Sequence, residues 1–210
     1  MRQPVLERVD ERATDVRSSR RALLGSAGAL GALATFPLIS RLLQLGNASA
    51  SPSIAQDARI LQFVLQLEYT QVSFYEEALQ QAGLKGDLRD FARAALEHER
   101  QHLAAIRRAL GAKAAAKPSF DFGQKVKSAR AFTQAAIQLE DIAVAGYNGQ
   151  ATNLTKSTLA AAAEIVSVEA RHAAWVRAIA GEVAAPHPVD EPMTAKQAAQ
   201  VGRASCRERA

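Results

Sequence analysis

Two Glu-x-x-His sequences, about seventy residues apart, place the strongest constraint on how this chain folds. Glu99 and His102 form the first, Glu169 and His172 form the second, and each lies in a segment whose apolar residues recur every three or four positions. Residues three apart share one face of a helix, so each Glu and His lies on the same face as the apolar stripe. The pattern therefore predicts long amphipathic helices that bury carboxylates and imidazoles inside a helical bundle.

Four amphipathic segments make up the middle of the chain, and Gly83, Gly111 and Gly181 follow three of them. The links inside the first and the second pair of segments are short, which predicts two antiparallel helical hairpins. The link between the pairs, residues 112–127, contains Pro118 and is long enough when extended to run the length of a bundle. One long crossover favours an all-α, ferritin-like four-helix bundle over a simple up-and-down bundle. The expected helices cover residues 54–82, 87–110, 128–148 and 155–180.

The two predicted hairpins also resemble each other in sequence. A shift of about 72 residues aligns the first segment with the third, and a shift of about 70 residues aligns the second with the fourth. We therefore expect two copies of a helical hairpin, related by an approximate two-fold axis. Glu68 and Tyr75 align with Glu140 and Tyr147, and Glu99, His102 and Gly111 align with Glu169, His172 and Gly181.

A carboxylate interrupts the apolar stripe of the first segment and of the third, at Glu68 and Glu140. Together with the two Glu-x-x-His motifs, these residues place four carboxylates and two imidazoles at core positions. Buried carboxylates repel one another and are costly to desolvate, whereas two divalent cations balance four of them. A Glu from each of two helices, with Glu-x-x-His from each of the other two, is the pattern of di-iron and di-manganese carboxylate proteins. The predicted metal ligands are Glu68, Glu99, His102, Glu140, Glu169 and His172.

Ligand chemistry narrows the choice of metal. Oxygen and nitrogen ligands without a thiolate suit iron or manganese better than a structural zinc site. The chain has one cysteine, Cys206, which excludes an intrachain disulfide and a metal site built from cysteines. We therefore expect two metal ions, with iron favoured over manganese. The alternative is that the six residues face solvent and form surface ion pairs, which requires the apolar periodicity to be misread in all four segments.

Residues 54–200 resemble the ferritin-like superfamily, and more narrowly the exported bacterial ferritin-like proteins of the desiccation-related group. The stretches FDFG, QLEDIAVAGY and VEARHAAWVR carry this resemblance. It implies that the six predicted ligands match the metal ligands of the family, with Glu99 and Glu169 as the bridging carboxylates. Unlike cage ferritins, the chain has no clear fifth helix and its C-terminal part contains several prolines, which argues against iron storage in a protein shell.

Several residues near the predicted ligands are not expected to bind metal. Tyr75 and Tyr147 each lie seven residues beyond a predicted ligand on the same helix face, and we expect them to be aromatic caps on the core. The alternative is that they donate hydrogen bonds to a ligand or relay an electron. His98 follows the helix about 100° away from its neighbouring ligand, which predicts an exposed side chain outside the site. Trp175 is expected to pack and not to react.

The first fifty residues resemble an export signal. Arg20 and Arg21 precede an apolar stretch, and Ala48 and Ala50 form a small-residue cleavage pattern after it. These features are typical of a twin-arginine signal, so we expect a protein exported to the periplasm or the cell envelope. The alternative is a basic tail before a membrane anchor, and an uncleaved signal would itself hold the protein at a membrane.

The rest of the chain, after the first fifty residues, divides into a bundle and a C-terminal tail. Residues 51–181 form the predicted bundle, and residues 182–210 are expected to be a loose C-terminal tail with one short helix after Thr194. The net charge of +5 is uneven, because residues 1–50 carry +3 of it, and the remaining +2 in residues 51–181 is a small excess spread along the helices. We therefore expect no nucleic-acid partner.

Three functions fit this sequence, and they differ in what the metal site does. In the first, an oxidoreductase, two ferrous ions bind dioxygen or peroxide, and the substrate is Fe2+ itself or a peroxide. In the second, a non-enzymatic stress or envelope protein, the site stabilises the fold or is vestigial. The third is iron storage, which requires a large hollow homo-oligomer. The sequence favours the first and leaves the oligomeric state open.

Overall fold

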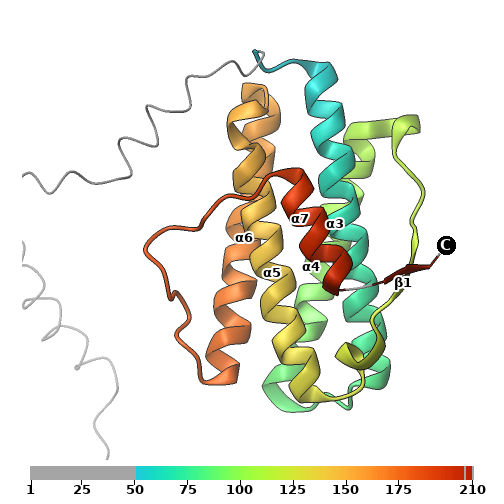
Figure 1. Cartoon of the computed structure of the whole chain (residues 1–210), viewed down its shortest axis with the longest axis vertical. Helices are drawn as coiled ribbons and strands as arrows, with labels where there is room; N and C mark the ends of the chain where they lie inside the picture. Colours follow the sequence, from blue (N-terminus) through green and yellow to red (C-terminus); the bar gives the residue numbers. More distant parts are fainter. Residues whose placement is uncertain (1–50, 206, 210) are drawn as a thin grey trace, which may run out of the picture. The chain divides into compact units, whose positions relative to one another are not determined.

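Residues 51–205 and 207–209 are described by a computed structural model, in which four long helices pack together as a bundle (Figure 1). The predicted all-α, ferritin-like bundle is confirmed. No helix in these residues is both long and apolar enough to cross a membrane, and the predicted export signal lies outside them. The bundle consists of α3 (Ile54–Gln81), α4 (Gly86–Leu110), α5 (Ala129–Gln150) and α6 (Lys156–Ala180), followed by α7 (Ala195–Ser205).

Local sequence signals explain where these helices begin and end. The side chains of Ser53 and Ser128 precede α3 and α5, and each accepts a hydrogen bond from the backbone N–H three residues later, at 3.3 and 3.2 Å. These caps satisfy N–H groups that the first helical turn leaves unpaired. Gly181 follows α6 with a φ of 75°, a left-handed conformation that glycine adopts without steric cost. Capping chemistry visible in the sequence therefore sets the starts of α3 and α5 and the end of α6.

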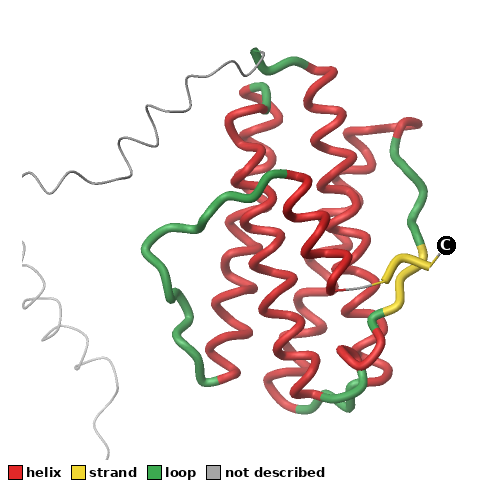
Figure 2. Tube along the Cα trace, viewed as in Figure 1, coloured by secondary structure: helices red, strands yellow, loops and turns green. Residues whose placement is uncertain are grey.

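A long crossover joins the two hairpins and runs along the outside of the bundle (Figure 2). It returns the chain to the end of the bundle at which α4 begins, so α5 runs in the same direction as α4 and opposite to α3 (Figure 1). The two-fold axis that relates the hairpins is therefore perpendicular to the bundle. The short elements are η2 (Gly111–Lys113), β1 (Ser119–Asp121), η3 (Gly123–Val126) and η4 (Ala151–Asn153), and β1 pairs antiparallel with β2 (Arg207–Arg209).

The C-terminal tail differs from the loose segment that the sequence predicts. The short helix expected after Thr194 is present as α7, but it packs against α5, and Ala198 in it is fully buried. The Met193 N–H donates to the Ala145 carbonyl at 2.9 Å. A Cβ added to Gly149 would lie 1.8 Å from the Met193 carbonyl oxygen, so only glycine permits this close approach. The tail docks because small residues on both sides allow backbone contact, which apolar periodicity does not reveal.

The two ends of the bundle have different cores. The end that contains the α3–α4 link is filled by aromatic rings, and we call it the aromatic end. The opposite end is built mainly from branched aliphatic side chains, and we call it the aliphatic end. The aromatic end contains Phe74, Phe91, Phe122 and Phe132, and the aliphatic end contains Val64, Leu65, Ile106 and Leu110.

A buried aspartate connects two helices at the aliphatic end. Asp57, at the start of α3, accepts hydrogen bonds from the Thr155 N–H at 2.9 Å and from the Thr158 hydroxyl at 2.6 Å. Burial of this carboxyl raises its pKa, but the bonds from Thr155 and Thr158 outweigh burial and lower the pKa below its usual value. These bonds fix the start of α6 against the start of α3. In the other hairpin the residue aligned with Asp57 is Ala129, which cannot accept such bonds.

Candidate metal centre

The six predicted ligands meet in the middle of the bundle, between its aromatic and aliphatic ends. Each of the four bundle helices contributes one carboxylate, and α4 and α6 each add the histidine one turn further along. All four carboxylate side chains are fully buried, and the two histidines are 9% and 2% exposed. The ligands are Glu68 on α3, Glu99 and His102 on α4, Glu140 on α5, and Glu169 and His172 on α6. The alternative of surface ion pairs is therefore wrong for these residues.

These side chains form two groups that share two members. In each group, one oxygen or nitrogen atom from every member lies within 4.8 Å of the others. Glu99 and Glu169 belong to both groups, which is the arrangement in which two carboxylates lie between two neighbouring ions. The first group is Glu68, Glu99, His102 and Glu169, and the second group is Glu99, Glu140, Glu169 and His172.

Both histidines turn the same ring nitrogen toward the carboxylates. His102 Nδ1 lies 2.9 Å from a Glu169 oxygen and 3.1 Å from a Glu99 oxygen. His172 Nδ1 lies 3.0 Å from Glu99 and 3.5 Å from Glu140. The Nδ1 atoms therefore face the centre of the site, and the Nε2 atoms on the far side of each ring remain available for other partners.

Three of the buried carboxylates have pKa values that differ widely from one another. Burial alone raises the pKa of Glu99, but hydrogen bonds from His102 and His172 outweigh it and lower the pKa to about 2. Burial and the charge of Glu99 raise the pKa of Glu169 to about 8. The pKa of Glu68 is also well above its usual value, because of burial and repulsion from Glu99 and Glu169. In the absence of a cation, this centre therefore keeps protons on some of its carboxyl groups.

Burial acts on the pKa values of the two histidines in the opposite direction, but the neighbouring carboxylates raise both values. Burial lowers the pKa of His102, but hydrogen bonds to Glu169 and Glu99 outweigh it and raise the pKa to about 9. In the same way, Glu140 and Glu99 raise the pKa of His172 to about 10. Surplus negative charge thus attracts protons to both imidazoles, and a bound cation would replace these protons.

Buried polar atoms without a hydrogen-bond partner, among the described residues, also gather at this centre. A buried unpaired polar atom costs about 1–3 kcal/mol, so a group of them indicates a missing partner. The atoms are four oxygens and one imidazole nitrogen. As metal ligands, oxygen and nitrogen atoms without a thiolate fit iron or manganese. The buried Glu and His groups can therefore hold metal ions. The atoms without an assigned hydrogen bond are Glu68 Oε2, Gln71 Oε1, Glu99 Oε1, Glu169 Oε1 and His172 Nδ1, and all of them except Gln71 Oε1 lie within ion-pair distance of an oppositely charged neighbour.

Comparison with known proteins agrees with this arrangement. A family model for the ferritin-like domain matches residues 56–182. The chain belongs to the ferritin-like domain family. The match spans α3 to α6 and all six predicted ligands of this ferritin-like domain. A search of curated proteins finds no match to the chain.

Two tyrosines cross between the hairpins of the ferritin-like domain and contact its outer carboxylates. The Tyr147 hydroxyl donates to Glu68 Oε1 at 2.6 Å, and the Tyr75 hydroxyl donates to Glu140 Oε1. Burial and the adjacent carboxylates raise the pKa of both tyrosines well above the usual value, so both keep their protons. The expectation that they only cap the core is wrong, and the alternative of a hydrogen bond to a predicted ligand describes them.

Gln71 is a contact of the site that the sequence analysis missed. Its side chain is 1% exposed, and its Nε2 donates to Glu169 Oε2 at 3.0 Å and to Glu140 Oε2 at 3.3 Å. Gln71 lies three residues after Glu68, the same spacing as in Glu-x-x-His. This spacing is the one feature of the sequence that indicates Gln71 faces the site. The aligned residue in the other hairpin is Ala143, so the repeat did not reveal it.

His98 is a second residue that the sequence placed outside the site. It is exposed as predicted, but its Nδ1 lies 2.9 Å from His172 Nε2, and the two rings stack with their centroids 5.2 Å apart. The prediction was wrong because it considered only α4, whereas His98 reaches across to a ligand on α6. Burial and the neighbouring charge of His172 lower the pKa of His98. A neutral His98 can therefore accept the Nε2 proton of His172 and orient its ring.

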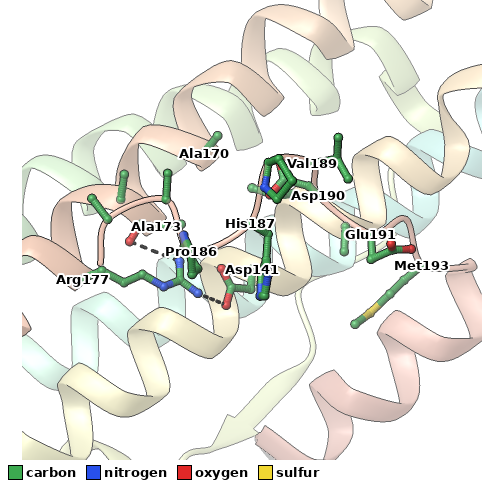
Figure 3. Close-up of a pocket in the computed structure, with 16 residues that line it drawn as sticks. Asp141, Ala170, Ala173, Arg177, Pro186, His187, Val189, Asp190, Glu191 and Met193 are labelled. Carbon is green, nitrogen blue, oxygen red and sulfur yellow. Dashed lines mark hydrogen bonds and ion pairs between the residues drawn. The ribbon is translucent and has the colours of Figure 1, made fainter. Parts of the chain in front are cut away.

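One cavity near these helices lies away from the predicted ligands. It has a volume of about 380 Å³ and lies between α5, α6 and the loop before α7 (Figure 3). An ion pair between Arg177 and Asp141 crosses its wall, and His187 lies beside it (Figure 3). None of the six predicted ligands lines this cavity, so it is separate from the candidate metal centre.

Proposed function

We propose that this ferritin-like protein binds two metal ions, iron in preference to manganese, and acts in the oxidation of Fe2+ or in a reaction with dioxygen or peroxide. The observation that carries the proposal is the pair of overlapping ligand groups, which share Glu99 and Glu169. A single ion would leave one histidine and one carboxylate of the set without a role. Four carboxylates also match the charge of two divalent cations.

The residues around the centre suit such a reaction. Two iron ions held by these residues would supply electrons to an oxidant such as dioxygen or peroxide. Glu68 and Glu140 are each oriented by a tyrosine hydroxyl, so their positions are fixed before a metal binds. Because all four carboxylates are fully buried, bulk water is excluded and charge interactions at the centre are strong.

Metal analysis of the purified full chain tests the proposal. We expect about two iron ions per chain after anaerobic loading with Fe2+, as the two ligand groups require. Glu99→Ala removes a member of both groups and should reduce the content to near zero. Glu97→Ala is the matched control, because Glu97 lies on the same helix and is exposed. A folded protein that takes up neither iron nor manganese would refute the proposal.

The proposal extends to the location of the protein. We infer that residues 1–50 direct export by the twin-arginine route, to the periplasm or the cell envelope, as the resemblance to the exported desiccation-related group suggests. Arg20 and Arg21 support this inference, because paired arginines before an apolar stretch are typical of such signals. Replacement of both by lysine should retain the protein in the cytoplasm of its host, as measured by cell fractionation. Unchanged export of the double variant would overturn it.

A further inference from the structure

A second cavity lies at the aliphatic end of the bundle, beside the candidate metal centre. It has a volume of about 250 Å³ and is lined by residues of all four bundle helices. Val64, Ile106 and Ile165 form its inner wall, and Tyr147 closes it toward the predicted ligands. Val64 and Ile106 are almost fully buried, whereas Ala109, Ser157 and Ala161 are exposed, so the cavity is open to solvent on one side and its inner part reaches into the core.

The inner wall lies one helical turn from the first ligand group. Val64 precedes Glu68 by four residues, and Ile165 precedes Glu169 by four. Four residues correspond to a rise of about 6 Å along a helix. Tyr147 spans the remaining space, because this residue lines the cavity and its hydroxyl donates to Glu68 at 2.6 Å. A molecule in this cavity would therefore contact the tyrosine that orients a predicted ligand.

The wall of the cavity is apolar and uncharged. Apart from the hydroxyls of Tyr147, Ser157 and Thr158, its described lining consists of Ala, Val, Leu and Ile side chains. Such a wall offers no charged partner for a carboxylate, a phosphate or an ammonium group, and burying one there would be costly. Apolar cavities of about 150 Å³ bind molecules as large as benzene, so this one is large enough for a substituted ring or a short alkyl chain.

The sequence repeat shows what fills the same space in the other half of the bundle. Phe91 and Trp175 pack edge-to-face there, with ring centroids 5.3 Å apart. The aligned residues at the aliphatic end are Ala161 and Ala105, and both line the cavity. Two aromatic side chains in one half are thus replaced by two alanines and an open volume in the other. The cavity is the space of an aromatic pair that the chain itself does not supply.

We propose that this cavity binds a small, uncharged apolar compound, namely an aromatic ring or a short alkyl chain. The alanine positions create the volume, the apolar wall selects an uncharged molecule, and Tyr147 limits how closely the molecule approaches Glu68. This binding site goes beyond the proposed function and does not depend on bound metal. The proposed function matters only for what the cavity's position beside the candidate metal centre would mean, and not for binding itself.

Binding of toluene to the metal-free full chain tests the proposal, with titration calorimetry as the measurement. We expect toluene to bind with a Kd of about 1 mM or lower, and benzoate, which has the same ring with a carboxylate, to bind at least about tenfold more weakly. Ala105→Trp combined with Ala161→Phe recreates the aromatic pair and should weaken toluene binding by about tenfold or more. The matched control is Ala104→Trp with Ala160→Phe, because both alanines are exposed and neither lines the cavity.

Thermal unfolding of each variant keeps this test decisive. A filled cavity should leave the melting temperature of the aromatic-pair variant equal to or above that of the unmodified chain. If that variant does not fold, the single change Ala161→Phe takes its place in the toluene titration. Toluene that fails to bind, or that binds the folded variant as tightly as the unmodified chain, overturns the proposal, and so does equal binding of benzoate. Iron content is measured separately, so loss of the proposed function would not be mistaken for loss of this site.

Discussion

The aliphatic and the aromatic end form two halves of the bundle, each with one ligand group. The ligands of the two halves are equivalent, but their surroundings differ. Glu68 with His102 and Glu140 with His172 occupy equivalent positions of the repeat, and each outer carboxylate accepts a hydrogen bond from the tyrosine of the opposite hairpin. Beyond these residues the equivalence ends. The half with Glu68 faces the cavity at the aliphatic end, whereas the half with His172 borders the rings of the aromatic end.

The polar contacts also differ between the halves. Gln71 and His98 both contact the second ligand group, and the aligned residues, Ala143 and Val168, have no side chain capable of the same hydrogen bonds. The repeat has therefore kept the residues that can bind metal and the two tyrosines, and has changed the positions of Gln71 and His98. Two metal ions in equivalent ligand sets should consequently differ in affinity, and the following experiments separate the halves.

Removal of the outer ligands of one half should have the largest effect. Glu68→Ala with His102→Ala leaves the second ligand group intact, so we expect the iron content to fall from about two ions per chain to about one. Glu140→Ala with His172→Ala should have the same effect on the other ion. Elemental analysis and Fe2+ titration measure both. If either double variant loses both ions, the two halves bind cooperatively and the comparison fails.

Truncation of the aromatic end should be more destabilising than truncation of the aliphatic end. Phe91 is fully buried among other rings, so Phe91→Ala should lower the free energy of unfolding by about 3–5 kcal/mol. Ile165 is half-buried and already borders a cavity, so Ile165→Ala should cost about 1–2 kcal/mol. Urea unfolding of the metal-free protein measures both values. Equal losses would show that the two ends are packed equally well.

The metal-free protein should lose stability as the pH rises. The pKa values of His102 and His172, about 9 and 10 in the folded protein, exceed the unfolded value of about 6.5. The stabilisation from each protonated histidine is therefore complete below about pH 6.5 and is lost as the pH rises through these folded values. Glu169, with a folded pKa of about 8, adds a loss between about pH 4.3 and 8.

Urea unfolding after chelation, at pH 6 and pH 9, measures this dependence. We expect the free energy of unfolding to be lower at pH 9, by several kcal/mol in total. His102→Ala and His172→Ala should each remove part of the dependence, which assigns a share to each half. Metal binding requires deprotonated ligands, so Fe2+ affinity should rise over the same range. Stability that is constant between these pH values would contradict the charges assigned to the centre.

Loss of a positioning residue should have the smallest effect and should act on one half only. Gln71→Leu removes the hydrogen bonds to Glu140 and Glu169, and we expect the affinity of the second ion to fall by about 10- to 100-fold. His98→Ala should lower the same affinity by about tenfold. Fe2+ titrations that resolve the two ions measure the change, with the exposed Gln138→Leu as control. An equal loss for both ions would argue against inequivalent halves.

Much of the fold and the ligand set could be predicted because both depend on periodic patterns. Long amphipathic segments and glycine stops define the helices, and a carboxylate at a core position is conspicuous when it recurs in four segments. The features that were missed depend on contacts between different helices. His98 contacts α6, and Gln71 contacts α5 and α6, and neither partner can be read from the sequence of one helix.

The tail and the cavity were missed for a related reason. The docking of α7 depends on the close approach of Met193 to Gly149, and a glycine in a sequence does not indicate which segment approaches it. The cavity depends on Ala105 and Ala161, which are unremarkable in an alanine-rich helix. Only their alignment with Trp175 and Phe91, together with the packing of those rings, shows that a volume is missing.

The crossover has a consequence for how the two hairpins depend on each other. Each ligand group takes three residues from one hairpin and one from the other, because Glu169 completes the first group and Glu99 completes the second. Neither hairpin alone contains a complete group. A chain cleaved in the crossover would therefore give two fragments with three ligands each, and bound metal should favour their reassembly. The metal centre would then serve as a template for fragment complementation, and metal uptake would report that the two hairpins have joined.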